Sequence, residues 1–197
     1  MIHIIVGLGN PGEEYEGTRH NTGRDAVLHF AKKTEFGEWE PDKKSKSLIA
    51  EGKIGKVKVT AVLPETFMNN SGKAVKNFVS SIKKPESLIV VHDDMDLPIG
   101  SYKISFNKSA GGHRGVDSII KAVKSQEFMR IRIGVSPAKG KGVKKPQGEK
   151  AVIDFILGKY KKPEMEKIKG VFKQAAEVIS NLIMEGKDRV MSGFHRK

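Results

Sequence analysis

A histidine in a glycine-rich segment is the residue of this chain best suited to catalysis. His20 lies within residues 17–23, a polar stretch that closely follows the glycine-rich residues 7–12. A glycine-rich loop beside a buried strand is a poor place for a core side chain. An imidazole with an unperturbed pKa of about 6.5 can accept a proton near neutral pH. The sequence therefore indicates a general base at His20.

Further polar clusters occupy residues 67–72, 92–96 and 111–115, and each follows a strand-like segment. One fold could therefore bring them to His20. Asp93, at the end of a buried strand, is a suitable acceptor for the second ring nitrogen of His20, as in the histidine–aspartate half of a hydrolytic triad. The chain has no cysteine and no serine in a nucleophile-elbow pattern. Without such a nucleophile, His20 and Asp93 favour attack by an activated water over a covalent intermediate.

Asparagines beside glycine and proline form another candidate group. A carboxamide both donates and accepts hydrogen bonds, so Asn10, Asn69 and Asn70 could recognise an amide, although asparagine also serves in turns. The backbone N–H groups of residues 111–115 and the guanidinium of Arg114 would suit a phosphate. Both features are candidate binding groups.

The glycines of residues 7–12 match the dinucleotide-binding pattern G-x-G-x-x-G. That pattern requires a helix whose N-terminus holds the pyrophosphate, and an acidic residue about 20 positions later at the end of a second strand. Here Glu13, Glu14 and Glu16 bring carboxylates to the pyrophosphate position, and Gly17 interrupts a helix. No second strand that ends in an acidic residue follows at the spacing that the pattern requires. A dinucleotide enzyme is therefore a minor alternative.

A hydrolytic metal site is a second alternative. Its ligands would come from six residues: His20, His92, Asp93, Asp94, Asp96 and His113. Imidazoles and carboxylates are common ligands of hydrolytic metals. No paired-histidine spacing supports the site, and the acidic residues 93–96 could simply form a turn before Pro98. We expect no metal and no other cofactor.

A strong positive charge indicates a polyanionic partner. The chain has 36 Lys and Arg against 23 Asp and Glu, a net charge of +13 and a pI of about 9.8. RNA is the leading candidate, ahead of DNA or an anionic membrane. Basic residues gather at 139–150, a glycine-rich stretch predicted to be a mobile loop, and at 43–46.

The remaining composition favours the cytoplasm. No apolar run approaches the ~20 residues of a membrane span, and the N-terminus lacks the features of a signal peptide. The absence of cysteine excludes disulfides and thiolate metal sites. We expect a cytoplasmic protein with no membrane partner.

The elements that must position these residues alternate along the chain. Apolar runs and period-two alternation predict strands at 2–6, 48–54, 57–63, 88–91, 102–106 and 129–135. Helical spacing predicts helices near 27–31 and at 73–82, 116–124 and 163–185. This mixture indicates an α/β protein: a single-domain α/β/α sandwich with a mixed, partly parallel central sheet over residues 1–186. Residues 187–197 are predicted to be a basic, loosely held tail.

These residues together resemble the bacterial peptidyl-tRNA hydrolase family over nearly the whole chain. The resemblance rests on the residues at 6–12, 18–23, 66–69, 71–72, 92–100, 111–113 and 155–158, together with Tyr15. Several specific motifs in the right order make a chance match very improbable. The family cleaves the ester that joins a peptide to the 3′ end of tRNA, which recycles tRNA from stalled translation.

The resemblance implies roles for nine residues. His20 would take a proton from water, Asp93 would hold His20 in its basic form, and Asn10 would read the first amide of the peptide. Tyr15, Phe67 and Asn69 would line the substrate site, with Asn69 also placed to steady the water or the oxyanion. Met68 would pack against the catalytic side chains, and His113 would help shape the cleft. The ninth residue, Arg114, is a departure, because the family usually has asparagine after Gly-Gly-His.

The resemblance also implies how the substrate is held. Peptidyl-tRNA would bind at its acceptor end and largely through its phosphate backbone, which residues 139–150 and the basic C-terminal segments would contact. The family acts without a metal and usually as a monomer. The main rival is a non-catalytic relative that keeps the fold and cleft but uses them only to bind RNA.

Overall fold

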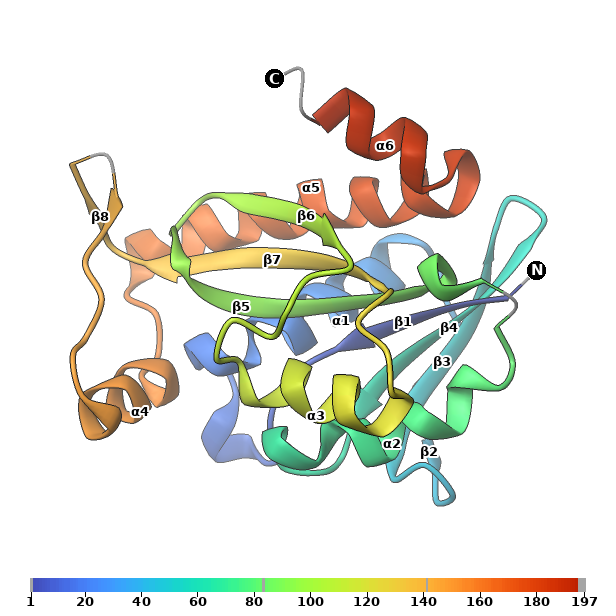
Figure 1. Ribbon diagram of the computed structural model, residues 1–197, viewed down its shortest axis with the longest axis horizontal. Helices are drawn as coiled ribbons and strands as arrows, with labels where there is room; N and C mark the ends of the chain where they lie inside the picture. Colours follow the sequence, from blue (N-terminus) through green and yellow to red (C-terminus); the bar gives the residue numbers. More distant parts are fainter. Residues whose placement is uncertain (1, 83, 141, 195–197) are drawn as a thin grey trace.

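A mixed sheet forms the centre of the computed structural model, which describes residues 2–82, 84–140 and 142–194. Within these ranges, seven strands pair in the order β2-β3-β4-β1-β5-β7-β6 (Figure 1). They are β1 (Ile2–Gly7), β2 (Glu40–Asp42), β3 (Ser47–Ile54), β4 (Val57–Pro64), β5 (Leu88–Pro98), β6 (Tyr102–Phe106) and β7 (Met129–Ser136). β1 runs parallel to β4 and β5, and β5 runs parallel to β7, whereas the outer pairs are antiparallel. The expected mixed, partly parallel sheet is confirmed.

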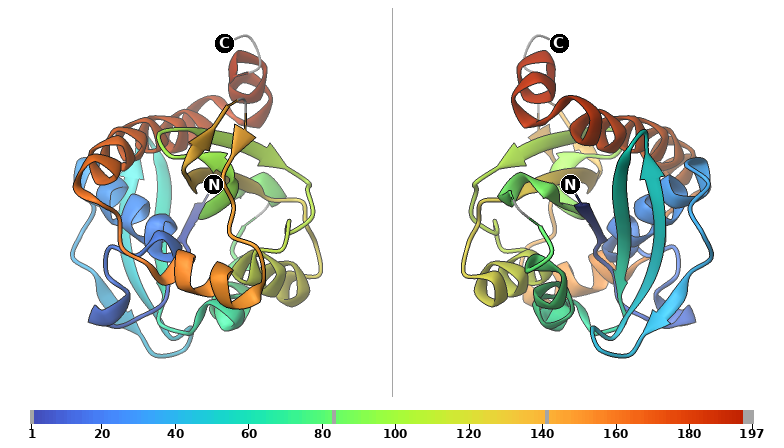
Figure 2. Two further views of the ribbon diagram at one scale, coloured as in Figure 1. Left: turned by 90° about the vertical axis from the view of Figure 1, so that its left-hand side faces the viewer. Right: turned by 90° about the vertical axis from the view of Figure 1, so that its right-hand side faces the viewer.

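Helices cover both faces of this sheet (Figures 1 and 2). The helices α1 (Thr22–Lys33) and α5 (Lys162–Glu185) pack on one face, and α2 (Ser71–Val79) and α3 (Arg114–Val123) pack on the other. The side chains of β1 alternate between these layers: Ile5 joins the core under α1 and α5, while Ile4 and Val6 join the core under α2 and α3. A strand that is buried on both faces consists of a continuous run of apolar residues, and such a run predicts β1 from the sequence.

Strand β5 is longer than the sequence suggested. It continues past Val91 through the acidic residues and ends at Pro98. β7 pairs with it to Asp94 and again, after a register shift, at Pro98. Arg132 of β7 also forms an ion pair with Asp94. The suggested turn at residues 93–96 is therefore wrong, because the neighbouring strand supplies both hydrogen-bond and charge partners.

The basic segment 139–150 is more regular than a loop. Its start belongs to a two-stranded hairpin of β8 (Ala138–Lys139) and β9 (Gly142–Val143). Its end opens helix α4 (Glu149–Leu157). Backbone pairing and the start of a helix therefore reach into the predicted loop, and its mobility stays a prediction.

The expected loose tail is also a helix over most of its length. α6 (Lys187–Phe194) follows α5, and its residues Val190 and Met191 pack against the core beneath α1 and α5. Apolar burial therefore holds these residues, which the basic composition of the tail obscured. The tail prediction for residues 195–197 falls outside the described residues. No helix in the described ranges combines the length and the apolar composition needed to cross a membrane.

Candidate active site

The polar clusters converge at one edge of the sheet. β1, β4 and β5 run in the same direction, so their carboxyl ends meet there. Asn10 follows β1, Met68 follows β4, and Asp93 lies in the middle of β5. Parallel pairing therefore brings together motifs that are far apart in the sequence.

Glycine allows the turn that bears His20 to lie directly against β5. His20 is in the short 3-10 helix Arg19–Asn21, immediately before α1. A Cβ atom at Gly23 would lie 2.2 Å from the carbonyl oxygen of Val91. No side chain fits in that space, so the first turn of α1 packs on β5 only with glycine at this position. This close approach places His20 beside Asp93.

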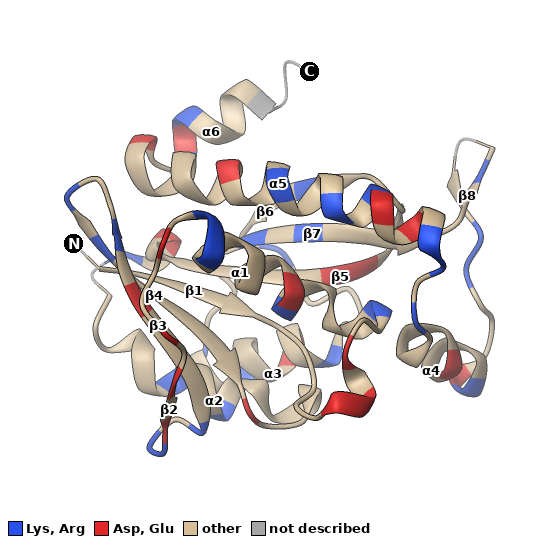
Figure 3. Ribbon diagram, turned by 180° about the vertical axis from the view of Figure 1, so that it is seen from behind, with Lys and Arg blue, Asp and Glu red and all other residues tan. Residues whose placement is uncertain are grey.

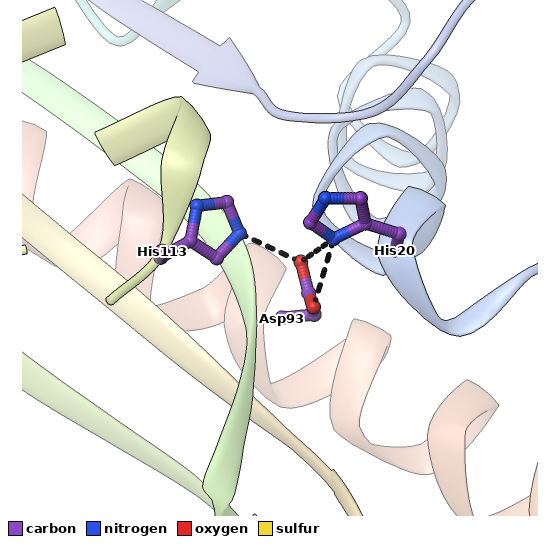
Figure 4. A group of neighbouring side chains, drawn as sticks. All are labelled: His20, Asp93 and His113. Carbon is purple, nitrogen blue, oxygen red and sulfur yellow. Dashed lines mark hydrogen bonds and ion pairs between the residues drawn. The ribbon is translucent and has the colours of Figure 1, made fainter. Parts of the chain in front are cut away.

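Three side chains from three elements form a hydrogen-bonded group around one carboxylate (Figure 4). His20 Nδ1 lies 3.1 Å from both Asp93 Oδ1 and Oδ2. His113, the residue before α3, places its Nε2 2.8 Å from Asp93 Oδ1. His20 is 8% exposed and Asp93 is 3% exposed, so these bonds are shielded from water.

The hydrogen bonds define the tautomers of both histidines. His113 Nδ1 accepts from the backbone N–H groups of Gly115 and Val116, so the proton of a neutral His113 is on Nε2 and points to Asp93. An ionised Asp93 only accepts hydrogen bonds, so His20 also donates from Nδ1. The Nε2 lone pair of a neutral His20 is then free to accept a proton, as a general base requires.

Electrostatics keep Asp93 ionised and strengthen His20 as a base. Burial alone would raise the pKa of Asp93, but the charges of His20 and His113 and their hydrogen bonds hold it well below its usual range. Burial alone would lower the pKa of His20, but the charge and hydrogen bond of Asp93 outweigh it and raise that pKa above 6.5, against the opposing charge of Arg114. His20 thus binds a proton more tightly than a free imidazole does.

The six-residue metal site that the sequence allowed does not form. Among the described residues, only His20, Asp93 and His113 of that set place their ligand atoms close together, within 4.8 Å of one another. His92 instead bonds through Nδ1 to the carbonyl of Asp93, and Asp94 and Asp96 pair with Arg132 and Lys145.

The remaining triad is a poor metal site. A metal needs the lone pair of His113 Nε2, but that nitrogen carries the proton because Nδ1 accepts two backbone N–H groups. The hydrogen bonds of this group therefore suit proton transfer better than metal coordination.

The dinucleotide alternative also fails on geometry. Gly12 is not followed by a helix that could hold a pyrophosphate, because Glu13–Tyr15 is a single 3-10 turn and α1 begins only at Thr22. The first glycines instead permit close packing: a Cβ atom at Gly9 would lie 2.8 Å from the Cβ of Arg24. The glycine pattern therefore serves packing between β1 and α1.

Asn10 is held from three directions. Its backbone N–H donates to Asn21 Oδ1 at 2.8 Å, and its carbonyl accepts from Asn21 Nδ2 at 2.9 Å. The backbone N–H of Met68 donates to Asn10 Oδ1 at 2.8 Å. Because a donor occupies Oδ1, the amide group that Asn10 can offer to a ligand is Nδ2.

A cleft of about 720 Å³ connects these groups. It is lined by most of the residues that the sequence singled out, namely Asn10, His20, Phe67, Met68, Asn69, Asp93, His113 and Arg114. Met68 is buried, whereas Phe67 and Asn69 are exposed at the cleft wall. Tyr15 is not among the lining residues. It ends the 3-10 turn Glu13–Tyr15, and its place in the substrate site stays a prediction.

Arg114 lies at the rim and points to the opposite wall. Its guanidinium is 2.8 Å from Glu149 Oε1, and both side chains are largely exposed. This ion pair connects the first residue of α3 with the first residue of α4 across the cleft. The charge of Arg114 lowers the pKa of His20, but its hydrogen bond is to Glu149.

The sequence reasoning missed a basic part of the cleft. Lys108, Arg130 and Arg132 line it, together with the buried Ser105. Arg130 and Arg132 are two apart in β7, between the apolar residues of the opposite face, so the alternation of this strand could have revealed them. It also missed an apolar wall from α4, made by Val152, Ile153, Ile156 and Leu157.

Comparison with known proteins assigns the chain to a family. The family model described as peptidyl-tRNA hydrolase matches residues 4–197. The chain belongs to the peptidyl-tRNA hydrolase family. It is 44% identical to the peptidyl-tRNA hydrolase of Carboxydothermus hydrogenoformans over 197 residues, with 99% of each chain covered. It is 40% identical to that of Thermoanaerobacter sp. over 195 residues, covering 98% of this chain and all of the relative.

A solved structure supports the same assignment. The crystal structure of peptidyl-tRNA hydrolase from Acinetobacter baumannii superposes with a TM-score of 0.85 at 31% identity, covering 97% of this chain and 93% of that chain. The sheet and helices described above are therefore those of a peptidyl-tRNA hydrolase, and the predicted fold class is confirmed.

Proposed function

We propose that His20 activates the water with which this chain hydrolyses the ester between a peptide and the 3′ end of tRNA. The observation that carries this role is the bond from His20 Nδ1 to the buried Asp93, which leaves Nε2 as the basic nitrogen in the cleft. Hydrolysis of peptidyl-tRNA follows from membership of the family and recycles tRNA from stalled translation.

The proton movements balance over two steps. His20 Nε2 takes a proton from water while the water oxygen bonds to the ester carbonyl carbon, giving a tetrahedral oxyanion. Asp93 stabilises the imidazolium that forms without itself taking the proton. The bond to the 3′ oxygen of the ribose then breaks, and His20 returns the proton to that oxygen. The products are the free peptide carboxyl group and tRNA with its hydroxyl restored.

Asn10 is proposed to select N-blocked substrates. Its Nδ2 would donate to a carbonyl oxygen of the peptide, because Oδ1 is already occupied by the Met68 N–H. A peptide or N-acetyl group has this additional carbonyl, and a free aminoacyl group lacks it. Asn69, exposed at the cleft wall, would steady the attacking water or the oxyanion.

The acceptor end of tRNA is proposed to bind along the basic part of the cleft. Lys108, Arg130 and Arg132 lie there beside the catalytic group, so phosphates could be held while the ester reaches His20. The hairpin and helix that contain residues 139–150 would extend the contact to more distant phosphates. We expect the protein to act as a monomer in the cytoplasm.

A purely RNA-binding role is the weaker hypothesis. Binding alone does not need a buried carboxylate that orients a histidine with a free lone pair, and these groups meet in the same cleft as Asn10. Each member of the expected catalytic set is present.

The deciding experiment compares hydrolysis of N-acetyl-aminoacyl-tRNA with that of the unblocked form, with a chelator present. The wild type should cleave only the blocked ester, and His20→Ala should abolish cleavage. His29→Ala, a change outside the cleft where α1 packs against Phe172 of α5, should leave cleavage intact. Chelator-sensitive turnover would restore the metal alternative. A folded wild type that binds tRNA without cleaving it would overturn the catalytic role in favour of RNA binding.

A further inference from the structure

His113 contacts the catalytic carboxylate from the side opposite His20. Asp93 Oδ1 accepts from His113 Nε2 at 2.8 Å and from His20 Nδ1 at 3.1 Å. His20 also contacts Oδ2 at 3.1 Å, so its hydrogen bond is shared between both oxygens. The shortest bond to Asp93 in this group therefore comes from His113 and not from the proposed base.

The second nitrogen of His113 is bound to helix α3. Its Nδ1 caps the helix by accepting from the N–H groups of Gly115 and Val116 at 3.2 Å each. A ring held at both nitrogens cannot turn, and its Nε2 proton stays directed at Asp93. His113 therefore connects the N-terminus of α3 rigidly to the carboxylate in β5.

We propose that His113 is a positioning residue that limits how strongly Asp93 holds the proton of His20. This inference rests on the proposed role of His20 as the base. A hydrogen bond to an anion disperses its charge, so the bond from His113 weakens the attraction that Asp93 exerts on the His20 imidazolium. Without it, His20 would remain protonated at higher pH, and less of the enzyme would be in the basic form.

The other charged and titratable groups near His20 do not replace this bond. Arg114, from the same end of α3, lowers the pKa of His20 through its charge and makes its own bond to Glu149 of α4. Arg19, the neighbour of His20, is paired with Glu164 of α5. His92 packs edge-on against the His113 ring, 4.7 Å between centroids, and burial lowers its own pKa well below 6.5. Only His113 competes with His20 for Asp93 among the described residues.

Two substitutions separate the two bonds of His113. In His113→Asn the side-chain oxygen is placed like Nδ1, so it can cap α3, but the side chain is too short to reach Asp93. In His113→Gln the side-chain amide is placed like Nε2, so it can donate to Asp93, but the helix cap is lost. Both variants remove the ring, so a difference between them reports on the hydrogen bonds alone.

Two measurements on the wild type and both variants test the proposal. One is the NMR titration of the His20 ring in the free protein, and the other is the acid limb of kcat/KM against pH. His113→Asn should move both midpoints to higher pH by about half a unit, which lowers kcat/KM on the acid limb about threefold and leaves the high-pH plateau in place. His113→Gln should keep the midpoints of the wild type but lower the melting temperature, because it loses the cap.

Several results would overturn the proposal. One is a His20 midpoint that does not move in His113→Asn, and another is an equal movement in both variants, which would assign the effect to the ring. Loss of the fold in His113→Asn would count against it too, since that variant keeps the cap. The NMR titration needs no substrate, so an inactive wild type would refute the proposed function without touching this result.

Discussion

At the residue scale, one backbone N–H decides what Asn10 can recognise. Met68 donates to Asn10 Oδ1, and this turns Nδ2 into the group that is available to a ligand. The same logic applies to His113, whose two backbone donors decide which ring nitrogen carries the proton. In both cases a neighbouring main-chain group converts an ambiguous side chain into a defined donor. The chemistry of the cleft therefore depends on contacts that no side-chain type predicts by itself.

Arg114 can be tested at this scale. Its guanidinium pairs with Glu149 at the exposed rim, and such exposed pairs contribute at most about 1 kcal/mol. Arg114→Asn, which restores the residue usual in the family, should keep kcat/KM within about tenfold, a barrier change of roughly 1.4 kcal/mol. The acid limb of the pH profile should move upward, because the arginine charge lowers the pKa of His20.

A matched variant shows whether the arginine itself matters. Glu149→Gln leaves Arg114 in place without its partner, and kcat/KM should again stay within about tenfold of the wild type. Near-total loss of activity in Arg114→Asn, with Glu149→Gln still active, would refute the hypothesis that Arg114 substitutes for the amide.

At the element scale, Arg19 joins the turn that bears His20 to the segment between α4 and α5. Its guanidinium donates to the carbonyls of Gly158 and Lys159 and pairs with Glu164 at 2.9 Å. It also lies 4.7 Å from the ring centroid of Phe155 in α4. No residue of α4 is buried, so this helix has little packing of its own to hold it. Arg19 therefore fixes one wall of the cleft relative to the catalytic histidine.

Removing this connection should cost stability. Arg19→Met would remove the guanidinium bonds to two carbonyls and a carboxylate, and breaking a largely buried pair costs about 3 kcal/mol. Arg19→Lys should recover only part of this, because an ammonium cannot match the planar fork of donors. Urea unfolding followed by circular dichroism would give the free energies.

The control for Arg19 is an exposed ion pair. Lys33 pairs with Glu177 on the surface of α1 and α5, and Lys33→Met should change the free energy of unfolding by less than about 1 kcal/mol. Equal effects of Arg19→Met and Lys33→Met would refute the structural role assigned to Arg19.

At the scale of the whole molecule, the net charge of +13 is spread over several elements. Figure 3 shows Lys and Arg positions on β7, a strand of the sheet, and on α5, which packs on one face of that sheet. Some basic residues, among them Lys108 and Arg132, line the same cleft as the catalytic group. The general charge should speed the encounter with tRNA, and the cleft residues should hold it.

Salt dependence separates these two contributions. The affinity for tRNA should fall steeply as salt rises, because each phosphate contact releases counterions. Lys108→Gln should reduce the slope of log affinity against log salt by about 1, whereas Lys169→Gln, at an exposed position of α5, should change it little. A flat salt response in the wild type would contradict phosphate recognition.

Much of the fold and the composition of the site could be predicted from the sequence. The apolar runs of the central strands, the alternation in β7 and the helical spacing of α5 report burial directly, because burial selects residue type at a period of 2.0 or 3.6. The polar clusters after those strands identified His20, Asp93 and Asn10. The resemblance to the family rested on the same clusters and on their order along the chain.

Only the tertiary structure decided how these residues act on one another. His20 and Asp93 are 73 positions apart, and Arg19 and Glu164 are 145 apart, so no local pattern encodes their contact. The sequence also missed the helix at 187–194 and the regular structure within 139–150, where packing or pairing overrides local composition. Residue type limits which bonds a side chain can form, but the backbone pairing of remote strands decides which partner it meets. The orientation of Asn10 and the partner of Arg114 follow from such distant contacts, whereas the tautomer of His113 is set by the local cap of α3 and meets Asp93 only in the folded chain.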